Sequence, residues 1–217
     1  MRLVLLGAPG AGKGTQAKLI EKQWGVRQLS TGDILRSAVE KETELGQTAR
    51  RYMDTGRLLP DEVMLDLIRE VLGSLEYGGG FILDGFPRTI TQAEGLDRLL
   101  GEMGLALDEV LSIEVPDEAI VNRLGKRRTC EDCGELFNLD TRPPKQPGVC
   151  DRCGGRLSRR EDDGPETVGR RLEVYHRETE PLKAYYAERG LLRAVNGDRD
   201  VERIYGEIVG GWDSRPS

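Results

Sequence analysis

Apolar residues concentrate in five short runs of this chain, of which the first contains no polar residue over residues 3–6, and longer segments between the runs have apolar residues at every third or fourth position. A short run without polar residues is typical of a parallel strand covered on both faces. The longer spacing is typical of an amphipathic helix. The runs predict strands over residues 2–6, 26–29, 81–83, 110–115 and 191–195. The periodic segments predict helices over residues 13–24, 31–40, 45–55, 61–72, 89–100, 117–127, 165–189 and 201–209.

Most of these strands and helices alternate, which favours a parallel sheet with helices on both faces. Two stretches break the alternation. Residues 30–59 hold two successive helices without a strand between them, and residues 130–163 are rich in Gly, Pro, Arg and Cys. We expect both stretches to be excursions from the sheet core. Pro181 is expected to break or kink the last long helix, because proline cannot donate the backbone hydrogen bond that a helix interior requires.

The composition narrows the class of protein. A chain of 217 residues is long enough for one well-buried core with excursions. Its 32 Lys and Arg against 38 Asp and Glu give a net charge of −6, which disfavours non-specific binding of nucleic acid. No segment approaches the roughly 20 apolar residues of a membrane-spanning helix, and the apolar run at 3–6 is far too short for a signal-peptide core. We expect a cytoplasmic protein with no membrane or nucleic-acid partner.

The first predicted strand leads directly into a glycine-rich loop and then a helix. The loop reads Gly7-Ala8-Pro9-Gly10-Ala11-Gly12-Lys13-Gly14-Thr15. Glycines let the backbone turn its N–H groups toward phosphate oxygens at a helix N-terminus, and Lys13 adds positive charge for the outer phosphates. The loop therefore predicts binding of a nucleoside triphosphate. Gly14 stands where related loops have a hydroxyl residue, which points away from the GTPase-like arrangement and puts direct ligation of Mg²⁺ by a hydroxyl in doubt.

An acidic residue, Asp84, ends the predicted strand at 81–83. It is expected at the carboxyl edge of the sheet, where ligands of open α/β folds gather and where a carboxylate can orient Mg²⁺ or its waters.

Arginines fall within or beside the second excursion. Phosphoryl transfer needs positioning and positive charge around the transferred group, and the guanidinium fork matches phosphate oxygens better than an ammonium group does. We expect a basic wall over the triphosphate, made by Arg123, Arg127, Arg160 and Arg171. Other arginines are expected to be solvated surface residues, among them Arg142, Arg152 and Arg159. His176, the lone histidine, is expected to be structural or exposed.

The four cysteines form two C-x2-C pairs, Cys130 with Cys133 and Cys150 with Cys153. This spacing is typical of a tetrahedral zinc site in which four thiolates leave no open position, so the metal would be structural. The surrounding segment has too few apolar residues to bury a core, and a metal would supply the folding free energy instead. A zinc ribbon could also bind nucleic acid or a protein, but the net negative charge and the absence of interleaved aromatic residues count against that use.

Taken together, these motifs closely resemble those of the adenylate kinase family, in order and over nearly the whole chain. The matching segments are the glycine loop, Ser30-Thr31-Gly32-Asp33, Asp84-Gly85-Phe86-Pro87-Arg88, Pro116-Asp117-Glu118, Arg127-Arg128 and Glu166-Thr167-Val168 with Arg171. The cysteine-bearing insertion resembles the long-lid, zinc-bearing form found among bacteria. The resemblance implies an α/β three-layer P-loop fold with a five-stranded parallel sheet, a helical AMP-binding insertion and a zinc-bearing lid insertion.

The resemblance also implies reversible transfer of the terminal phosphoryl group from Mg·ATP to AMP, giving two ADP, by a monomer. It divides the chain into a core at 1–29, 60–125 and 164–217, an AMP-binding segment at 30–59 and a lid at 126–163. The resemblance further implies a lid that moves as one body and would exclude water on closing, and a cis Phe86-Pro87 bond.

Site residues follow from the same resemblance. The catalytic residues would be Lys13, Asp84, Arg88, Arg123, Arg160 and Arg171. ATP would be bound by Gly10, Ala11, Gly12, Lys13, Gly14, Thr15, Arg123, Arg127, Leu136, Phe137 and Arg199. AMP would be bound by Thr31, Arg36, Arg57, Leu58, Leu59, Gly85, Phe86, Pro87, Arg88, Gln92, Arg160 and Arg171. Arg36 and Arg88 would hold the AMP phosphate, and Gln92 would read the adenine edge.

Two other functions remain open from the sequence. One is a kinase that phosphorylates another nucleoside monophosphate or uses GTP as donor, because acceptor choice depends on a few contacts around Thr31, Leu58, Leu59 and Gln92. The other is a zinc-dependent adaptor for nucleic acid or protein that retains an ATP-binding core. The adaptor predicts ATP binding without AMP-dependent turnover, and salt-sensitive binding to polynucleotide.

Overall fold

Five parallel strands form the central sheet of the protein, whose computed structural model describes residues 1–74 and 80–213. The strand order is β2-β3-β1-β4-β8, and all four neighbouring pairs are parallel, as expected. These strands are β1 (Arg2–Leu6), β2 (Arg27–Ser30), β3 (Phe81–Asp84), β4 (Glu109–Glu114) and β8 (Leu192–Asn196). Val26, Val115 and Leu191, which we predicted as strand residues, lie just outside their strands.

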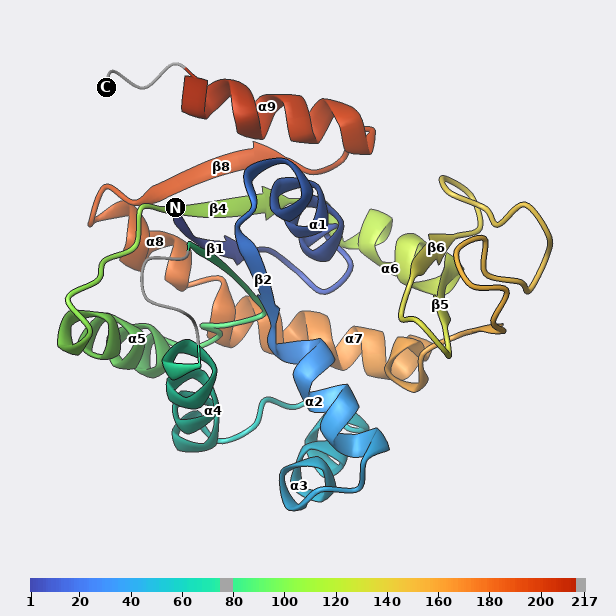
Figure 1. The fold of residues 1–217 in the computed structure, drawn as a ribbon, viewed down its shortest axis with the longest axis horizontal. Helices are drawn as coiled ribbons and strands as arrows, with labels where there is room; N and C mark the ends of the chain where they lie inside the picture. The colour runs from blue at the N-terminus through green and yellow to red at the C-terminus, as the bar shows by residue number, and fades with distance from the viewer. Residues whose placement is uncertain (75–79, 214–217) are drawn as a thin grey trace.

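Helices cover both faces of the sheet (Figure 1). They are α1 (Lys13–Trp24), α4 (Asp61–Gly73), α5 (Ile90–Glu102), α6 (Asp117–Lys126), α7 (Pro165–Val174), α8 (Leu182–Ala187) and α9 (Val201–Asp213). Successive side chains of β1 point to opposite faces. Leu3 and Leu5 pack with residues of α1 and α9, whereas Val4 and Leu6 pack with residues of α4, α5 and α8. This alternation explains why the strand is apolar without interruption.

The first excursion consists of two helices, α2 (Thr31–Glu40) and α3 (Glu44–Met53), which lie beside each other away from the sheet (Figure 1). Each begins at a hydroxyl cap: Ser30 accepts from the backbone N–H of Asp33, and Thr43 accepts from that of Gly46. A Cβ added at Gly46 would lie 2.0 Å from the carbonyl oxygen of Ala38, so the helices approach closely only because residue 46 is glycine.

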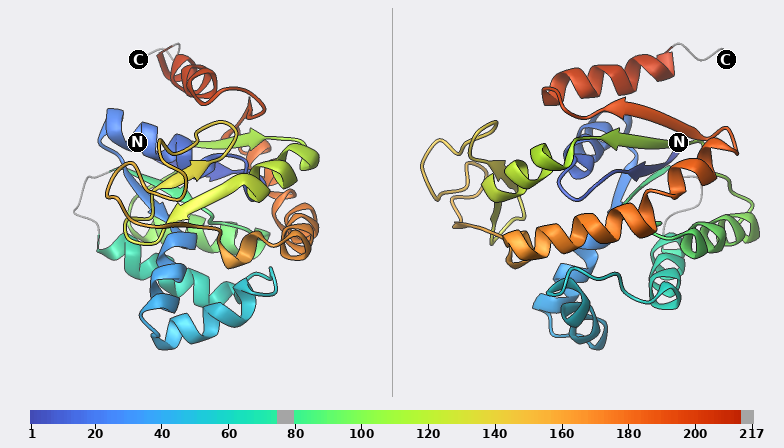
Figure 2. Two further views of the ribbon diagram at one scale, coloured as in Figure 1. Left: turned by 90° about the vertical axis from the view of Figure 1, so that its right-hand side faces the viewer. Right: turned by 180° about the vertical axis from the view of Figure 1, so that it is seen from behind.

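The second excursion is a small antiparallel sheet with the order β6-β5-β7. Its strands are β5 (Arg127–Cys130), β6 (Leu136–Asn138) and β7 (Leu157–Ser158). A 3-10 turn over Glu161–Asp163 joins it to α7. Figures 1 and 2 show this sheet on the side toward which β4 points, beyond the carboxyl ends of the central strands.

The expected helix over 165–189 is wrong as a single element. After α7 the chain makes a wider π-helical turn over Tyr175–Thr179, and α8 follows at Leu182. The backbone N–H of Glu180 bonds to the carbonyl of Tyr175, five residues back, at 2.8 Å. Pro181 has no N–H to continue the ladder, so the break lies just before it. The helix expected over 117–127 ends one residue earlier, because Arg127 already has extended backbone angles in β5.

The last helix is fixed at the amino edge of the sheet, opposite the glycine loop. Trp212 of α9 stacks edge-on against Trp24 of α1, with ring centroids 5.3 Å apart. Its indole N–H donates to the buried carboxylate of Glu109 at 2.6 Å, and Arg193 pairs with the same carboxylate at 2.8 Å. In the described part of the chain, no helix has the length and apolar character to cross a membrane.

Candidate functional site

The glycine loop wraps around the start of α1. Gly10 and Gly12 have φ angles of +85° and +100°, which residues with a Cβ rarely adopt. The ammonium group of Lys13 folds over the loop and donates to the carbonyl oxygens of Gly7 and Ala8 at 2.7 and 2.9 Å. The positive charge therefore lies over a turn of backbone N–H groups at a helix N-terminus, which is the arrangement that binds phosphate.

Asp84 lies at the end of β3, facing the loop. The side-chain amide of Gln28 in β2 donates to its Oδ2 at 3.0 Å. A Cβ added at Gly14 would lie 3.2 Å from the same oxygen. Glycine in the place of the expected hydroxyl residue therefore leaves room for this carboxylate beside the loop.

Burial shifts the pKa of both charged groups at the base of this site. It lowers the pKa of Lys13 to about 8, against the opposing effect of Asp84 and with the further help of Arg88 and Arg171. Burial likewise raises the pKa of Asp84, although Lys13 counteracts it. The two groups are thus held with little water around them, where the charge of a phosphate has a strong effect.

A cavity of about 460 Å³ opens above the loop, within the range of roughly 300–1,000 Å³ usual for small-molecule sites. A smaller cavity of about 60 Å³ adjoins it. The side chains of Arg36, Arg88 and Arg171 line both. Three guanidinium groups therefore stand where the two cavities meet.

The smaller cavity is enclosed by α2, the segment after α3 and the start of α5. Apolar residues and one amide make its wall: Leu35, Met53, Leu58, Leu59, Met64 and Gln92. The turn after β3 borders it. Gly85 there has a φ of +85°, and a Cβ on it would lie 2.9 Å from the hydroxyl oxygen of Thr31. The Phe86-Pro87 bond is cis, as the resemblance implies.

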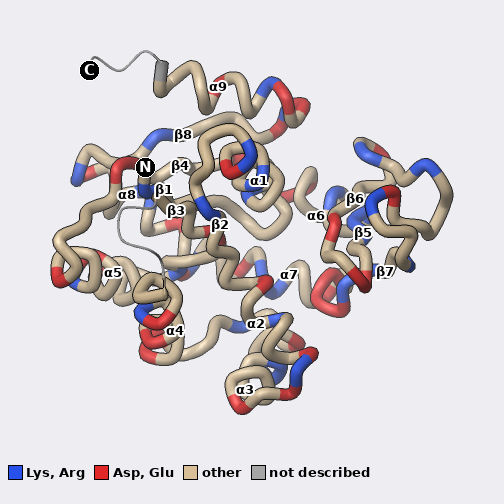
Figure 3. Tube along the Cα trace, viewed as in Figure 1, with Lys and Arg blue, Asp and Glu red and all other residues tan. Residues whose placement is uncertain are grey.

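Carboxylates hold the arginines in place around the cavities. Arg127 makes two hydrogen bonds to Asp163, whose side chain is fully buried, and Arg171 donates to Asp162 at 2.8 Å. Arg160 donates to the hydroxyl of Thr129 at 3.0 Å. In Figure 3 acidic and basic segments alternate along this part of the chain.

The guanidinium groups nonetheless repel one another electrostatically. Burial, together with Arg171, lowers the pKa of Arg88 to about 10. Burial, together with Arg36 and Arg127, lowers the pKa of Arg160 to about 10. Positive charges held this close and this dry favour the entry of an anion.

The outer end of the larger cavity has both charged and apolar walls. Arg123 donates to the carbonyl of Gly197 at 2.9 Å and to Asp198 at 3.2 Å. Arg199 pairs with Glu207 at 3.1 Å. Leu136 and Phe137 of β6 complete this end of the wall, which could cover the flat face of a base.

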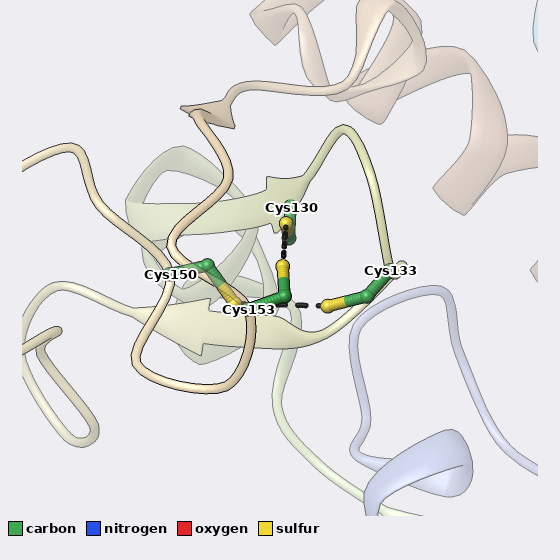
Figure 4. Close-up of side chains that lie close together, drawn as sticks. All are labelled: Cys130, Cys133, Cys150 and Cys153. Atoms are coloured by element: carbon green, nitrogen blue, oxygen red, sulfur yellow. Dashed lines mark hydrogen bonds between the residues drawn. The ribbon is translucent and has the colours of Figure 1, made fainter.

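The four cysteines converge in the small antiparallel sheet (Figure 4). Their sulfurs all lie within 4.8 Å of one another, with Cys130 and Cys153 3.4 Å apart and Cys133 and Cys150 3.6 Å apart. Zn–S bonds of about 2.3 Å in a tetrahedron place sulfurs about 3.8 Å apart, so the cluster fits this metal. Each pair is followed by a glycine with positive φ, Gly134 or Gly154, whose N–H bonds back to the first cysteine of the pair.

Known proteins resemble this chain over almost its full length. The family model described as adenylate kinase matches residues 5–191. A protein named adenylate kinase from Caldicellulosiruptor bescii is 52% identical over 209 residues, which cover 96% of this chain and 97% of that protein. Proteins of the same name from Thermodesulfovibrio yellowstonii and Archaeoglobus fulgidus are each 50% identical over 208 residues, covering 96% of this chain and 97% and 96% of those proteins.

The chain belongs to the adenylate kinase family.

Nearly all nucleotide-binding residues expected for an adenylate kinase line one of the two cavities. The larger is lined by the loop residues from Gly10 to Thr15 and by Asp84, Gly85, Pro87, Arg123, Arg127, Leu136, Phe137, Arg160 and Arg199. The smaller is lined by Thr31, Arg57, Leu59 and Gln92, and both are lined by Arg36, Leu58, Arg88 and Arg171. Phe86 is the exception among these residues, all of which the structure describes. Its side chain is fully buried in the core beside α5.

Several acidic and amide residues of this adenylate kinase site were missed by the sequence reasoning. Gln28 contacts Asp84, Asp33 pairs with Arg36, and Asp162 and Asp163 hold Arg171 and Arg127. Adjacency in the sequence would not have found these pairs, because Asp162 and Asp163 directly follow Arg159 and Arg160 but their side chains pair with Arg171 and Arg127.

Arg152, Arg159 and His176 are exposed, as expected. Arg142 is exposed too, but it also lines the larger cavity, where it donates to the carbonyl of Leu136 at 2.9 Å. The ring nitrogens of His176 contact Glu180 and Asp117 rather than either cavity.

Proposed function

We propose that this protein catalyses the reversible transfer of the terminal phosphoryl group of Mg·ATP to AMP, giving two ADP. The observation that carries the proposal is the junction of the two cavities. One begins at a phosphate-binding loop, the other ends in an apolar pocket with a single amide, and arginines line the boundary. Such a geometry suits two nucleotides that meet phosphate to phosphate.

In this proposal the larger cavity takes the donor. Backbone N–H groups from Gly10 to Thr15 and the ammonium of Lys13 bind the β- and γ-phosphates of ATP. Arg123 and Arg127 bind the outer phosphates, and Leu136, Phe137 and Arg199 contact the adenosine end. The support is that all of these residues line one cavity.

The smaller cavity takes the acceptor. Its apolar wall, with Leu58, Leu59 and Thr31, surrounds the adenine, and Gln92 reads the base edge. Arg36 and Arg88 hold the phosphate of AMP at the boundary. The main-chain turn of Gly85 and Pro87 and the side chain of Arg57 complete the pocket. Arg36 and Arg88 suit this role because both line the two cavities.

The chemical step itself then needs little beyond alignment and charge. Arg160 and Arg171, with Arg88 and Lys13, surround the group in transit and stabilise the charge on its equatorial oxygens. Because little water surrounds these charges, each interacts more strongly with the transferred group. Exclusion of water also matters, because water competes with AMP as the acceptor.

Two metals belong to the proposal. The residues near the loop fit Mg²⁺, since the carboxylate of Asp84 lies beside it and is held by Gln28. Bound with ATP, Mg²⁺ neutralises phosphate charge and orients the oxygens. The sulfurs of Cys130, Cys133, Cys150 and Cys153 fit a structural Zn²⁺ that holds the small sheet together.

We also propose the division of labour among parts of the chain. Residues 1–29, 60–125 and 164–217 form the core, residues 30–59 bind AMP, and residues 126–163 form a lid. Support for a lid that meets the AMP segment comes from Arg160, whose guanidinium lies 3.8 Å from Asp33 of α2. We expect the protein to act as a monomer in the cytoplasm, in keeping with its family, which sedimentation and cell fractionation would test.

One coupled assay tests the central claim. ADP formation from Mg·ATP is measured with AMP, CMP, UMP and GMP in turn. We expect turnover with AMP and little with the other three. Activity only with another monophosphate would assign a different acceptor, and ATP binding without any turnover would favour the adaptor.

A further inference from the structure

One carboxylate lies directly behind the proposed base-reading residue. Asp61 is the first residue of α4 and does not line either cavity. Gln92 does line the smaller cavity, yet its surface is 1% exposed, so nearly all of it is enclosed by protein. Any influence of Asp61 on a bound base must therefore pass through Gln92.

Hydrogen bonds hold both ends of the Gln92 amide. The backbone N–H of Arg88 donates to its Oε1 at 2.8 Å. Its Nε2 donates to Oδ1 of Asp61 at 2.8 Å. A backbone N–H can only donate and a carboxylate can only accept, so these partners allow a single orientation of the amide. A flip would place oxygen against carboxylate and N–H against N–H within a nearly fully buried side chain.

The carboxylate is itself held in position. The hydroxyl of Thr89 donates to the same Oδ1 of Asp61 at 3.0 Å, and it accepts the backbone N–H of Gln92 at 3.1 Å. Thr89 is the N-cap of α5, so the arrangement is fixed to the ends of two helices. The orientation of the amide is thus part of the fold rather than a choice made by the ligand.

Two hydrogen-bonding positions of the amide stay available for a ligand. The amide nitrogen has one further N–H, and the amide oxygen has one further lone pair. Adenine matches this pair, because its 6-amino group donates and the ring nitrogens beside it accept. Hypoxanthine has the opposite pattern at the same edge, with a 6-oxygen that accepts and an N1–H that donates.

We propose that Asp61 is a positioning residue that makes the site prefer a 6-amino purine to a 6-oxo purine by preventing the Gln92 amide from flipping. This inference rests on the proposed function. With the amide fixed, the 6-oxygen of a 6-oxo purine faces the amide oxygen. With the amide flipped, its NH₂ would face that oxygen and the mismatch would disappear.

The test compares AMP with IMP, which differ at this edge and have no other substituent to confuse the fit. In Asp61→Asn, an NH₂ group can face the Gln92 oxygen, which removes the oxygen–carboxylate contact and leaves only the N–H of Arg88 to oppose the flipped amide. We expect the ratio of kcat/KM for AMP to that for IMP to fall by about tenfold or more. The KM for AMP should rise while kcat at saturation and the KM for ATP stay within about twofold, since the transferred group is untouched.

Asp61→Ala removes the acceptor without adding a donor, so its ratio should fall less than that of Asp61→Asn. It also answers the question if the Asn variant does not fold. Glu62→Gln is the matched control, because Glu62 is an exposed acid in the same first helical turn. It should keep the wild-type ratio.

An unchanged AMP to IMP ratio in the Asp61 variants overturns the proposal, as does an equal fall in the Glu62 variant. Loss of folding alone cannot imitate the expected result, since it would affect both substrates equally. Absence of AMP turnover in the wild-type protein would refute the proposed function instead.

Discussion

At the scale of single residues, the site keeps positive charges close together at a cost in hydration. The lowered pKa values of Lys13, Arg88 and Arg160 all have burial as their largest cause. Such groups are poorly solvated before a nucleotide arrives, and a bound phosphate supplies the charge that water does not. Whether Arg or Lys suits a given position then depends on whether the group must make two directed contacts, which a guanidinium can and an ammonium cannot.

Replacing Arg88 by Lys tests this geometry. The Nε of Arg88 donates to the carbonyl of Gly85 at 2.7 Å, which leaves the fork to face the cavities. A point charge cannot make both contacts, so Arg88→Lys should lower kcat by at least about 100-fold with an unchanged melting profile. Arg98→Lys, an exposed arginine of α5, is the control and should behave as wild type. Near-normal turnover of Arg88→Lys would show that Arg88 has another role.

A single methyl group tests the space beside the loop. Gly14→Ala places a Cβ 3.2 Å from Oδ2 of Asp84, tighter than an ordinary contact. We expect kcat/KM for Mg·ATP to fall by about fivefold or more, because the carboxylate must shift. Gly101→Ala, in α5, meets nothing within 4 Å and should leave activity unchanged while stabilising the helix by about 0.5–1 kcal/mol. Equal activity of both variants would contradict the role given to Gly14.

At the scale of elements, ends of helices are where the chain connects the core to its excursions. α6 leads into the small antiparallel sheet and α7 leads out of it. The exposed imidazole of His176, in the π-helical turn after α7, contacts Glu180 at 2.8 Å and Asp117, at the start of α6, at 2.9 Å. This contact joins the two connecting helices at their far ends.

The contact should make stability depend on pH. Hydrogen bonds to Glu180 and Asp117 raise the pKa of His176 above its ordinary 6.5. The folded protein therefore binds the proton more tightly, and the stabilisation is fully present below pH 6.5 and lost as pH rises through the raised value. His176→Gln should unfold more easily in urea at about pH 5.5, by less than about 1 kcal/mol since the pair is exposed, and like wild type at about pH 9. Arg177→Gln is the exposed neighbour for comparison. A difference that does not vary with pH would exclude the imidazolium as its source.

Much of the central sheet could be predicted from local pattern, and the exceptions have physical reasons. β1 and β3 are buried on both faces, so their apolar runs are unambiguous. The strands β5, β6 and β7 have only two to four residues each, and the segments that join them carry three of the four cysteines. No hydrophobic period can be read over so few residues. The π-helical turn was missed because Pro181 marks where a helix must stop and gives no sign of a wider turn before it.

The candidate site likewise has residues that could be predicted from the sequence and residues that could not. Residues on the motif-bearing loops were predicted because their spacing along the chain carries the chemistry. Asp61, Asp33 and Asp163 were not assigned roles, since their partners lie on other elements and the fold alone brings them together.

At the scale of the whole molecule, both excursions leave the sheet at its carboxyl edge and meet each other and the core. Arg160 reaches Asp33 of α2, and Lys18 of α1 lies 3.8 Å from Glu135 of the small sheet. The apolar cluster inside that sheet is small, comprising Phe137, Leu157, Cys130 and Cys150, with Cys133 packed against it. Its shape therefore depends on what binds the four sulfurs.

Loss of one sulfur should expose this dependence. Cys130→Ser should hold less than one zinc per chain by atomic absorption and melt at least about 4 °C lower, because the metal contributes folding free energy to a segment with little core. Lys145→Ala, an exposed change in the same segment, should keep both the zinc and the melting temperature. Full zinc content and unchanged melting in Cys130→Ser would rule out a structural metal here.

The contact between Trp24 and Trp212 has a practical consequence for measurements of the intrinsic tryptophan fluorescence of this protein. The chain has 2 tryptophans, and both lie where α1 meets α9, at the edge away from the cavities. We expect their fluorescence to report whether the final helix is docked and to change little when nucleotides bind. A fluorescence signal of nucleotide binding therefore requires a dye or an added tryptophan near the cavities. Phe137 is a suitable position for it, because this residue lines the larger cavity.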